Sequence, residues 1–246
     1  MNIVTRNKLI VALDVESAQA ARELVAALRG VVGMFKVGNR LFTAAGPSIV
    51  REIVDSGEKV FLDLKFHDIP NTVASAGVGA ARLGVSIFNV HASGGSEMMR
   101  RVADAVSNAA GAEGFVRPAI VAVTVLTSLD ETTLTSVGCR SKPDEQVRRL
   151  SLLAEASGMD GVVASAHEIG VVRSAVRRGF LIVVPGVRPS GDDFDDQKRV
   201  AVPAEAIRAG ADYIVVGRPI IKAKDPVQTA RQIIAEMSDV FAAQGS

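Results

Sequence analysis

Eight short apolar runs, separated by segments with helical spacing, are the feature that most constrains the fold of this chain. Most of the runs are continuously apolar and β-branched, as expected for strands buried on both faces of a parallel sheet. Parallel strands need long crossover connections, usually helices. The predicted strands are Lys8 to Val15, Gly33 to Gly38, Lys59 to Phe66, Ser86 to Ala92, Ala119 to Leu126, Gly161 to Ala164, Phe180 to Pro185 and Tyr213 to Gly217.

The segments between the runs have the spacing and the ends of helices. Ala18 to Leu28 is Ala-rich and amphipathic, and Pro47 stands where a first helical turn accepts proline. Pro70 is expected to stop the third strand, and Asn71-Thr72 to cap the following helix. The predicted helices are Ala18 to Leu28, Pro47 to Asp55, Thr72 to Arg82, Ser96 to Asn108, Pro143 to Ser157, Ala166 to Arg177, Pro203 to Ala209 and Pro226 to Met237.

Eight strand–helix units in 246 residues predict an α/β fold, a (β/α)8 TIM barrel that forms a single domain over residues 1–246. The alternative is a doubly wound open sheet. A dinucleotide-binding sheet of that kind can carry Gly-x-Gly-x-x-Gly after its first strand, whereas this chain has Asp14-Val15-Glu16-Ser17. The barrel is therefore preferred.

Composition restricts the partners and the compartment. The net charge of +1 gives no case for a nucleic-acid partner. No apolar run approaches the roughly 20 residues of a membrane span, so no membrane partner is predicted. The single cysteine, Cys139, excludes an internal disulfide and suits a reducing compartment. Because the N-terminal segment also lacks the apolar stretch of a signal peptide, we expect a cytoplasmic protein.

The third run ends in a cluster of charges formed by Asp63, Lys65 and Asp68. Asp63 and Lys65 are two residues apart, so they point to the same side of a strand. Buried charges are costly unless they satisfy each other, and a structural ion pair is one interpretation. Three charges within six residues of an apolar run favour a functional site instead.

Other polar residues also follow the predicted strands, and the carboxyl ends of barrel strands are where catalytic residues gather. Asp14 is interpreted either as part of the site or as the cap of the next helix. Asn89 and Thr124 are interpreted as hydrogen-bonded core groups. His91 is given a structural role, while His67 and His167 are placed in loops or at the surface. The three histidines lack a metal-binding spacing, so no metal is predicted.

The ends of the seventh and eighth strands predict a phosphate site. TIM barrels frequently bind phosphate there, and Arg188 and Arg218 supply cations while Gly217 allows close approach of the backbone. The polar segment from Pro189 to Arg199 lies between these strands. Its composition favours a lid over the phosphate, although a solvated acidic loop is the simpler alternative.

The run from Asp63 to Thr72, Asp-Leu-Lys-Phe-His-Asp-Ile-Pro-Asn-Thr, resembles the signature of the orotidine 5′-phosphate decarboxylase family. The Asp-x-Lys-x-x-Asp core is shared by a wider superfamily, and Ile-Pro-Asn-Thr makes the match specific. The resemblance spans nearly the whole chain. It includes Leu13-Asp14, Phe35 to Gly38, Leu126 to Ser128, Pro185 to Arg188, Gln197 and Val216 to Ile220.

The resemblance implies decarboxylation of orotidine 5′-monophosphate to UMP and CO2 without a cofactor, the last step of de novo pyrimidine nucleotide synthesis. Lys65 would donate the proton, within a network that includes Asp63, Lys36 and Asp68. The active form would be a homodimer in which Asp68, Ile69 and Thr72 reach the partner's site. Substrate would be bound by Asp14, Lys36, Asp63, Ile69, Thr72, Thr127, Ser128, Pro185, Arg188, Gln197, Gly217 and Arg218.

Two other functions stay open. Sugar-phosphate enzymes of the same superfamily share the Asp-x-Lys-x-x-Asp core but resemble this chain less, because they need Mg²⁺ and carry an acidic residue where this chain has Lys36. A non-catalytic nucleotide-phosphate binder is the second alternative. It would have no reason to keep three charges at a dry strand end.

Overall fold

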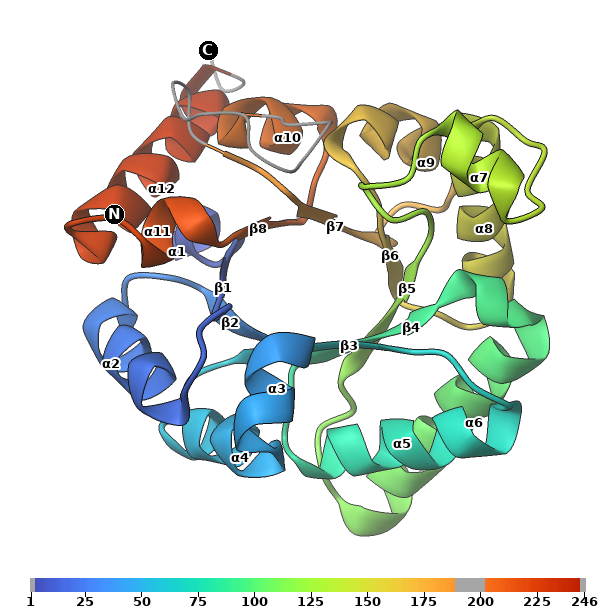
Figure 1. Cartoon of the computed structure of the whole chain (residues 1–246), viewed down its shortest axis with the longest axis horizontal. Coiled ribbons are helices and arrows are strands. Elements are labelled where there is room, and N and C mark those ends of the chain that lie inside the picture. The colour runs from blue at the N-terminus through green and yellow to red at the C-terminus, as the bar shows by residue number, and fades with distance from the viewer. Residues whose placement is uncertain (1–2, 189–201, 244–246) are drawn as a thin grey trace.

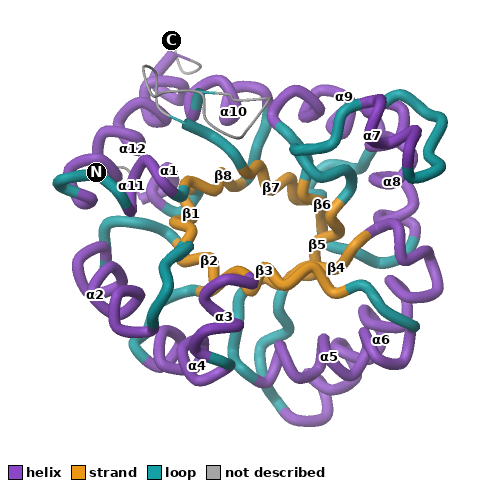
Figure 2. The backbone as a smooth tube through the Cα atoms, viewed as in Figure 1, coloured by secondary structure: helices purple, strands orange, loops and turns teal. Residues whose placement is uncertain are grey.

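The computed structural model describes residues 3–188 and 202–243. Eight parallel strands close into a barrel in chain order, and helices surround the ring of strands (Figures 1 and 2). The (β/α)8 fold is confirmed, whereas the single domain over residues 1–246 stays a prediction. The strands are β1 (Leu9–Ala12), β2 (Met34–Gly38), β3 (Val60–Phe66), β4 (Ile87–His91), β5 (Ala119–Val123), β6 (Gly161–Val163), β7 (Leu181–Pro185) and β8 (Tyr213–Val216).

Most predicted helices are present. The bounds of α2 (Ala18–Leu28), α4 (Pro47–Asp55) and α10 (Pro203–Ala209) agree with prediction. Those of α5 (Pro70–Arg82), α6 (Gly95–Glu113), α8 (Pro143–Ala156) and α12 (Pro226–Ala243) differ at one or both ends. The helix predicted from Ala166 to Arg177 is a 3₁₀ turn, η2 (Ala166–Glu168), followed by α9 (Ile169–Ala175). The short elements not predicted are α1 (Ile3–Arg6), α3 (Asn39–Ala45), η1 (Ala92–Gly94), α7 (Glu131–Ser136) and α11 (Arg218–Ile221).

Two expectations about helix caps are wrong. Helix α5 begins at Pro70 with Ile69 as its N-cap, so Asn71 and Thr72 lie inside the first turn. The fixed φ of proline suits the first helical position, which moves the start of the helix forward. Helix α2 is capped by Ser17, whose hydroxyl accepts the backbone N–H of Ala20, and not by Asp14.

Side chains alternate between the two faces of each strand, and the inward-facing ones form both the interior of the barrel and the site above it. The interior is filled by Ile10, Ala12, Met34, Phe61, Ile87, Val121, Val123, Val163, Val183 and Val215. Side chains two residues apart on a strand point to the same face. Lys36, Asp63 and Asn89 each stand two residues after an interior residue, so the same alternation brings them above this apolar layer.

The larger part of the core lies between the outer face of the barrel and the helices, where residues such as Val11, Phe35, Leu62 and Phe88 are buried. Both faces of the strands are therefore covered, which explains their continuous apolar runs. Among the described residues, no helix is long and apolar enough to cross a membrane.

Gly161→Ala should destabilise the fold by about 1–3 kcal/mol, because the added methyl group would overpack the space between β6 and β7. A Cβ at Gly161 would lie 2.4 Å from the carbonyl oxygen and 2.5 Å from the Cβ of Leu181 on the neighbouring strand. The backbone of β7 cannot yield without breaking the barrel's hydrogen bonds. Urea unfolding would measure the change in free energy of unfolding.

Gly170→Ala is the matched control. Gly170 is exposed in α9, and a Cβ there would meet no atom within 4 Å. Alanine restricts the unfolded chain and favours helix, so this variant should be at least as stable as the unsubstituted chain. Equal stability of the two variants would contradict the packing argument.

Candidate active site

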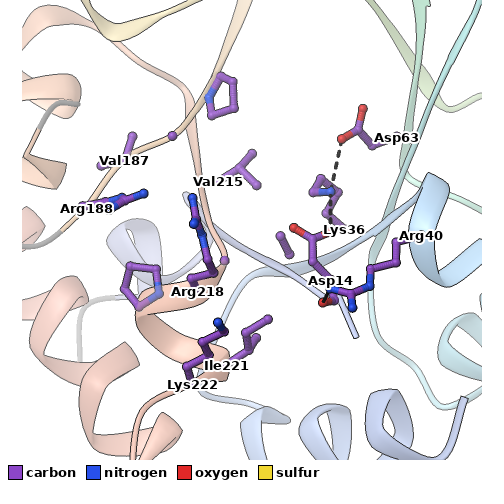
Figure 3. Close-up of a pocket in the computed structure, with 15 residues that line it drawn as sticks. Asp14, Lys36, Arg40, Asp63, Val187, Arg188, Val215, Arg218, Ile221 and Lys222 are labelled. Carbon is purple, nitrogen blue, oxygen red and sulfur yellow. Dashed lines mark hydrogen bonds and ion pairs between the residues drawn. The ribbon is translucent and has the colours of Figure 1, made fainter. Parts of the chain in front are cut away.

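A pocket of about 490 Å³ lies at the carboxyl ends of β1, β2, β3, β7 and β8. In Figure 3, Asp14, Lys36 and Asp63 lie on one side of it, and Arg188 and Arg218 lie across from them. The pocket is lined by seven of the residues predicted from the sequence: Asp14, Lys36, Asp63, Pro185, Arg188, Gly217 and Arg218. The structure therefore brings the predicted charge cluster and the predicted phosphate site to one cavity.

Four side chains of alternating charge form a continuous chain of ion pairs. The ammonium of Lys36 lies 3.2 Å from Asp14 Oδ1 and 3.2 Å from Asp63 Oδ2. The ammonium of Lys65 lies 2.6 Å from Asp63 Oδ1. The carboxylate of Asp63 is thus held between two lysines, with only 12% of its side chain exposed. We call Lys36, Asp63 and Lys65 the charge array.

The charge array keeps Lys36 and Asp63 ionised despite their burial. Burial disfavours the charged form of Lys36, but Asp63 and Asp14 outweigh it and raise the pKa of Lys36 above its ordinary value. Burial likewise disfavours the carboxylate of Asp63, yet Lys36 and Lys65 lower the pKa of Asp63 below its ordinary value. The ammonium of Lys36 and the carboxylate of Asp63 therefore both stay charged at neutral pH.

Lys65 has a backbone conformation that is unusual for its residue type. Its φ is +54°, and it is the one non-glycine residue with positive φ in the described part of the chain. The strand is irregular at this point, because Leu62 pairs with Phe88 while Phe66 pairs with Val90. Such strained residues concentrate at functional sites, where surrounding contacts hold them.

Asn89 belongs to this site and was missed by the sequence interpretation. Its side chain is buried, as expected for a core group, but its partners are Asp63 and Lys65. Thr124, interpreted in the same way, does bind only the core: its hydroxyl donates to the carbonyl of Val163 at 2.9 Å. A signal for Asn89 was available, since it stands two residues after the interior residue Ile87 on the strand beside Asp63.

The opposite side of the pocket is cationic, formed by Arg188, Arg218 and Lys222, the last of which the sequence did not single out. Arg40, also not singled out, lies on the side of Asp14 and donates a hydrogen bond to its backbone carbonyl (Figure 3). With Lys36, the described lining has five cationic side chains against two carboxylates, an excess of three positive charges. Gly217 also lines the pocket, and a Cβ there would lie in ordinary contact with the Cβ of Ala12 at 3.4 Å and Asp14 Oδ2 at 3.5 Å. The arrangement suits a small molecule with several negative charges.

Several predicted residues lie away from the lining. Thr127 and Ser128 stand in the turn after β5, and Lys65 reaches the pocket only through Asp63. Asp68, Ile69 and Thr72 are exposed. The carboxylate of Asp68 accepts the N–H of Ile69 at 2.7 Å, and within one described chain it forms no ion pair with Lys65. Gln197 and the segment Pro189 to Arg199 lie outside the described residues.

The histidines follow their predicted positions. His67 and His167 are exposed, and His91 is partly buried at the end of β4. The rings of His67 and His91 lie 5.4 Å apart between centroids. Burial, followed by the nearby His67 and Lys65, lowers the pKa of His91 below its ordinary value, so its imidazole is neutral at physiological pH.

Comparison with known proteins gives one consistent family. The model of the Orotidine 5'-phosphate decarboxylase / HUMPS family matches residues 7–233. Orotidine 5'-phosphate decarboxylase of Syntrophotalea carbinolica is 54% identical over 97% of this chain and 98% of its own length. The enzyme of the same name from Moorella thermoacetica is 53% identical over 96% and 94%. The crystal structure of orotidine 5'-phosphate decarboxylase from Lactobacillus acidophilus superposes with a TM-score of 0.82 at 37% identity, covering 93% of this chain and 98% of that one.

Asp63→Asn should lower the free energy of unfolding at neutral pH by about 3 kcal/mol, because two partly buried lysines lose their shared counter-charge. The pKa of Asp63 is lowered on folding, so its contribution is complete above the ordinary value of 3.8 and is lost as the pH falls through the lower folded value. The difference in the free energy of unfolding between the unsubstituted chain and Asp63→Asn should therefore shrink as the pH falls below 3.8 toward the folded pKa. Urea unfolding at about pH 7 and about pH 3 measures it.

Glu52→Gln is the control for this experiment. Glu52 pairs with Arg22 at 2.7 Å on the surface, where the side chains are 44% and 49% exposed. Solvent screens that pair, so its loss should leave stability nearly unchanged at both pH values. A difference for Asp63→Asn that stays constant between neutral and acid pH would contradict the depressed pKa.

Proposed function

The chain belongs to the Orotidine 5'-phosphate decarboxylase / HUMPS family, and we propose that it converts orotidine 5′-monophosphate to UMP and CO2 with Lys65 as the proton donor and without a cofactor. The observation that carries the proposal is the charge array above the apolar layer of the barrel, at the edge of a cationic pocket. The reaction completes the de novo synthesis of pyrimidine nucleotides. The single cysteine supports a cytoplasmic location.

The chemistry needs what the charge array supplies. Loss of CO2 from a vinylic carbon leaves an electron pair without the electron sink that a cofactor would provide. Fixed charges in a water-poor site can stabilise that pair, because they need no reorganisation during the reaction. An ammonium group beside the reacting carbon would supply such a charge. Lys65 carries one next to the pocket, held by Asp63 at 2.6 Å.

The proposed step is balanced by one proton. The bond between C6 of the pyrimidine and the carboxylate carbon breaks, CO2 departs, and the electron pair stays on C6. The ammonium of Lys65 donates a proton to C6, which gives UMP and a neutral amine that solvent reprotonates. Asp63 lies against the same lysine, and its carboxylate would also repel the carboxylate of the substrate.

The cationic side of the pocket suits the phosphate of the substrate. Arg188, Arg218 and the backbone at Gly217 would hold it, and the family resemblance adds Gln197, which lies outside the described residues, as a further phosphate ligand. Arginine forks match phosphate oxygens in geometry as well as charge. Binding energy gained there can be used to position the distant reacting bond and to exclude water. The ribose would be held by Asp14 and Lys36, and the pyrimidine edge by Thr127 and Ser128 beside Pro185.

The magnesium-dependent members of the superfamily fit this pocket less well. Lys36 places its ammonium between the two carboxylates that line the pocket, at 3.2 Å from each. A divalent cation bound to those carboxylates would face this positive charge at close range. Lys36 therefore favours the metal-independent reaction.

The active form is proposed to be a homodimer in which Asp68, Ile69 and Thr72 enter the partner's site. Two features of a single chain support this. Ile69 is 67% exposed, so its apolar side chain is accessible to a partner chain. Asp68 is exposed and does not join the charge array of its own chain, although the family signature includes it.

Mixing two inactive variants should restore activity. Lys65→Ala removes the proton donor, and Asp68→Asn removes the residue supplied across the interface. A mixed dimer has one complete site, with Lys65 from one chain and Asp68 from the other. After denaturation and refolding together, about a quarter of the unsubstituted activity should return, since about half of randomly formed dimers are mixed. Absorbance of orotidine 5′-monophosphate follows the reaction.

Lys65→Ala mixed with Lys36→Ala is the matched control. Lys36 and Lys65 contact the same Asp63, so each chain contributes both of its lysines to a single site. In a mixed dimer, one site therefore lacks Lys65 and the other lacks Lys36, and no complete site can form. Near-full activity of the Lys65→Ala variant by itself would show that Lys65 is not the proton donor. Failure of the first mixture, with both variants dimeric, would place Asp68 in the site of its own chain.

A further inference from the structure

Asn89 connects the two residues on which the proposed reaction depends. Its amide nitrogen donates to Asp63 Oδ1 at 2.7 Å, and its amide oxygen accepts the backbone N–H of Lys65 at 2.8 Å. The residue is only 1% exposed. Both hydrogen bonds are short and shielded from water, which makes them effective in a low-dielectric site.

The position of Asn89 coincides with the irregularity of β3. Between the pairs Leu62–Phe88 and Phe66–Val90, four steps along β3 face two steps along β4. The extra length is taken up around Lys65, which has a φ of +54°. Asn89 is the residue of β4 between the two pairs, and its side chain fills the gap in place of a backbone partner.

The chemistry of the two partners specifies the residue type. A carboxylate accepts hydrogen bonds and a backbone N–H donates one, so the bridging side chain must carry both a donor and an acceptor. An amide satisfies both at once. A carboxylate at position 89 would face Asp63 with a like charge, and an aliphatic side chain would leave the N–H of Lys65 and the oxygen of Asp63 without this partner.

We propose that Asn89 is a positioning residue, which holds the backbone of Lys65 in its left-handed conformation and fixes the carboxylate of Asp63, so that the Lys65 ammonium is aimed at the reacting carbon. This inference rests on the proposed decarboxylation for its catalytic consequence. Its geometric content does not depend on the substrate. A small displacement of a proton donor is costly, because rate depends steeply on alignment with the reacting atom.

Asn89→Leu keeps the approximate size of the side chain and removes both hydrogen bonds. We expect kcat for orotidine 5′-monophosphate to fall about 100-fold, as expected for misplacement of a catalytic group by roughly 1 Å. The dissociation constant for UMP should change less than about threefold, because Asn89 touches the proton donor and not the phosphate side of the pocket. A crystal structure of the variant should show Lys65 outside the left-handed region, or its ammonium displaced from Asp63.

Thr124→Val is the matched control, since Thr124 is similarly buried at 5% exposure and bonds only to Val163. It should lose some stability and keep its kcat. Should Asn89→Leu fail to fold, Asn89→Ala gives the same measurements with less crowding.

The inference is overturned if kcat stays within about threefold of the unsubstituted value, or if kcat and UMP affinity fall together. It is equally overturned if Lys65 keeps its conformation and contact in the variant structure. If the unsubstituted chain itself releases no CO2 from orotidine 5′-monophosphate, the proposed function fails, and the crystal structure still decides whether Asn89 holds Lys65.

Discussion

Asp63 lies between two lysine ammonium groups, with only 12% of its side chain exposed, where an unpaired carboxylate would be costly. The carboxylate is 3.2 Å from Lys36 and 2.6 Å from Lys65, directly above the apolar layer of the barrel. Each lysine compensates for the burial of Asp63, and Asp63 compensates for the burial of Lys36. Mutual dependence makes the array rigid, and rigidity is what electrostatic catalysis requires.

The barrel provides the array through the alternation of its strands. Lys36 follows Met34, Asp63 follows Phe61 and Asn89 follows Ile87, each by two residues. On β2, β3 and β4, the inward-facing side chains therefore change from apolar packing residues to polar site residues two positions further along the strand. Lys65 stands two residues beyond Asp63 on the same strand, and its backbone leaves the regular strand conformation there, with its N–H bonded to the side chain of Asn89.

The sequence predicts the barrel well because strands buried on both faces are continuously apolar, and the ends of α2, α4 and α10 are marked by local residues. It also predicts seven of the fifteen residues that line the pocket, since motif residues fall at strand ends. Short helices such as α3 and α11 lack a long periodic pattern, so they were missed. Asn89 was assigned to the core because burial and a catalytic contact look alike until its partners are known.

The central claim is that fixed lysine and aspartate charges carry out the decarboxylation without a metal. It is tested most directly by following the absorbance of orotidine 5′-monophosphate with protein dialysed against EDTA, before and after addition of Mg²⁺. The account predicts the same rate of UMP formation in both cases, because Lys36 lies between Asp14 and Asp63, the pair of carboxylates a cation would need. Activity that disappears on dialysis and returns with Mg²⁺ would contradict it.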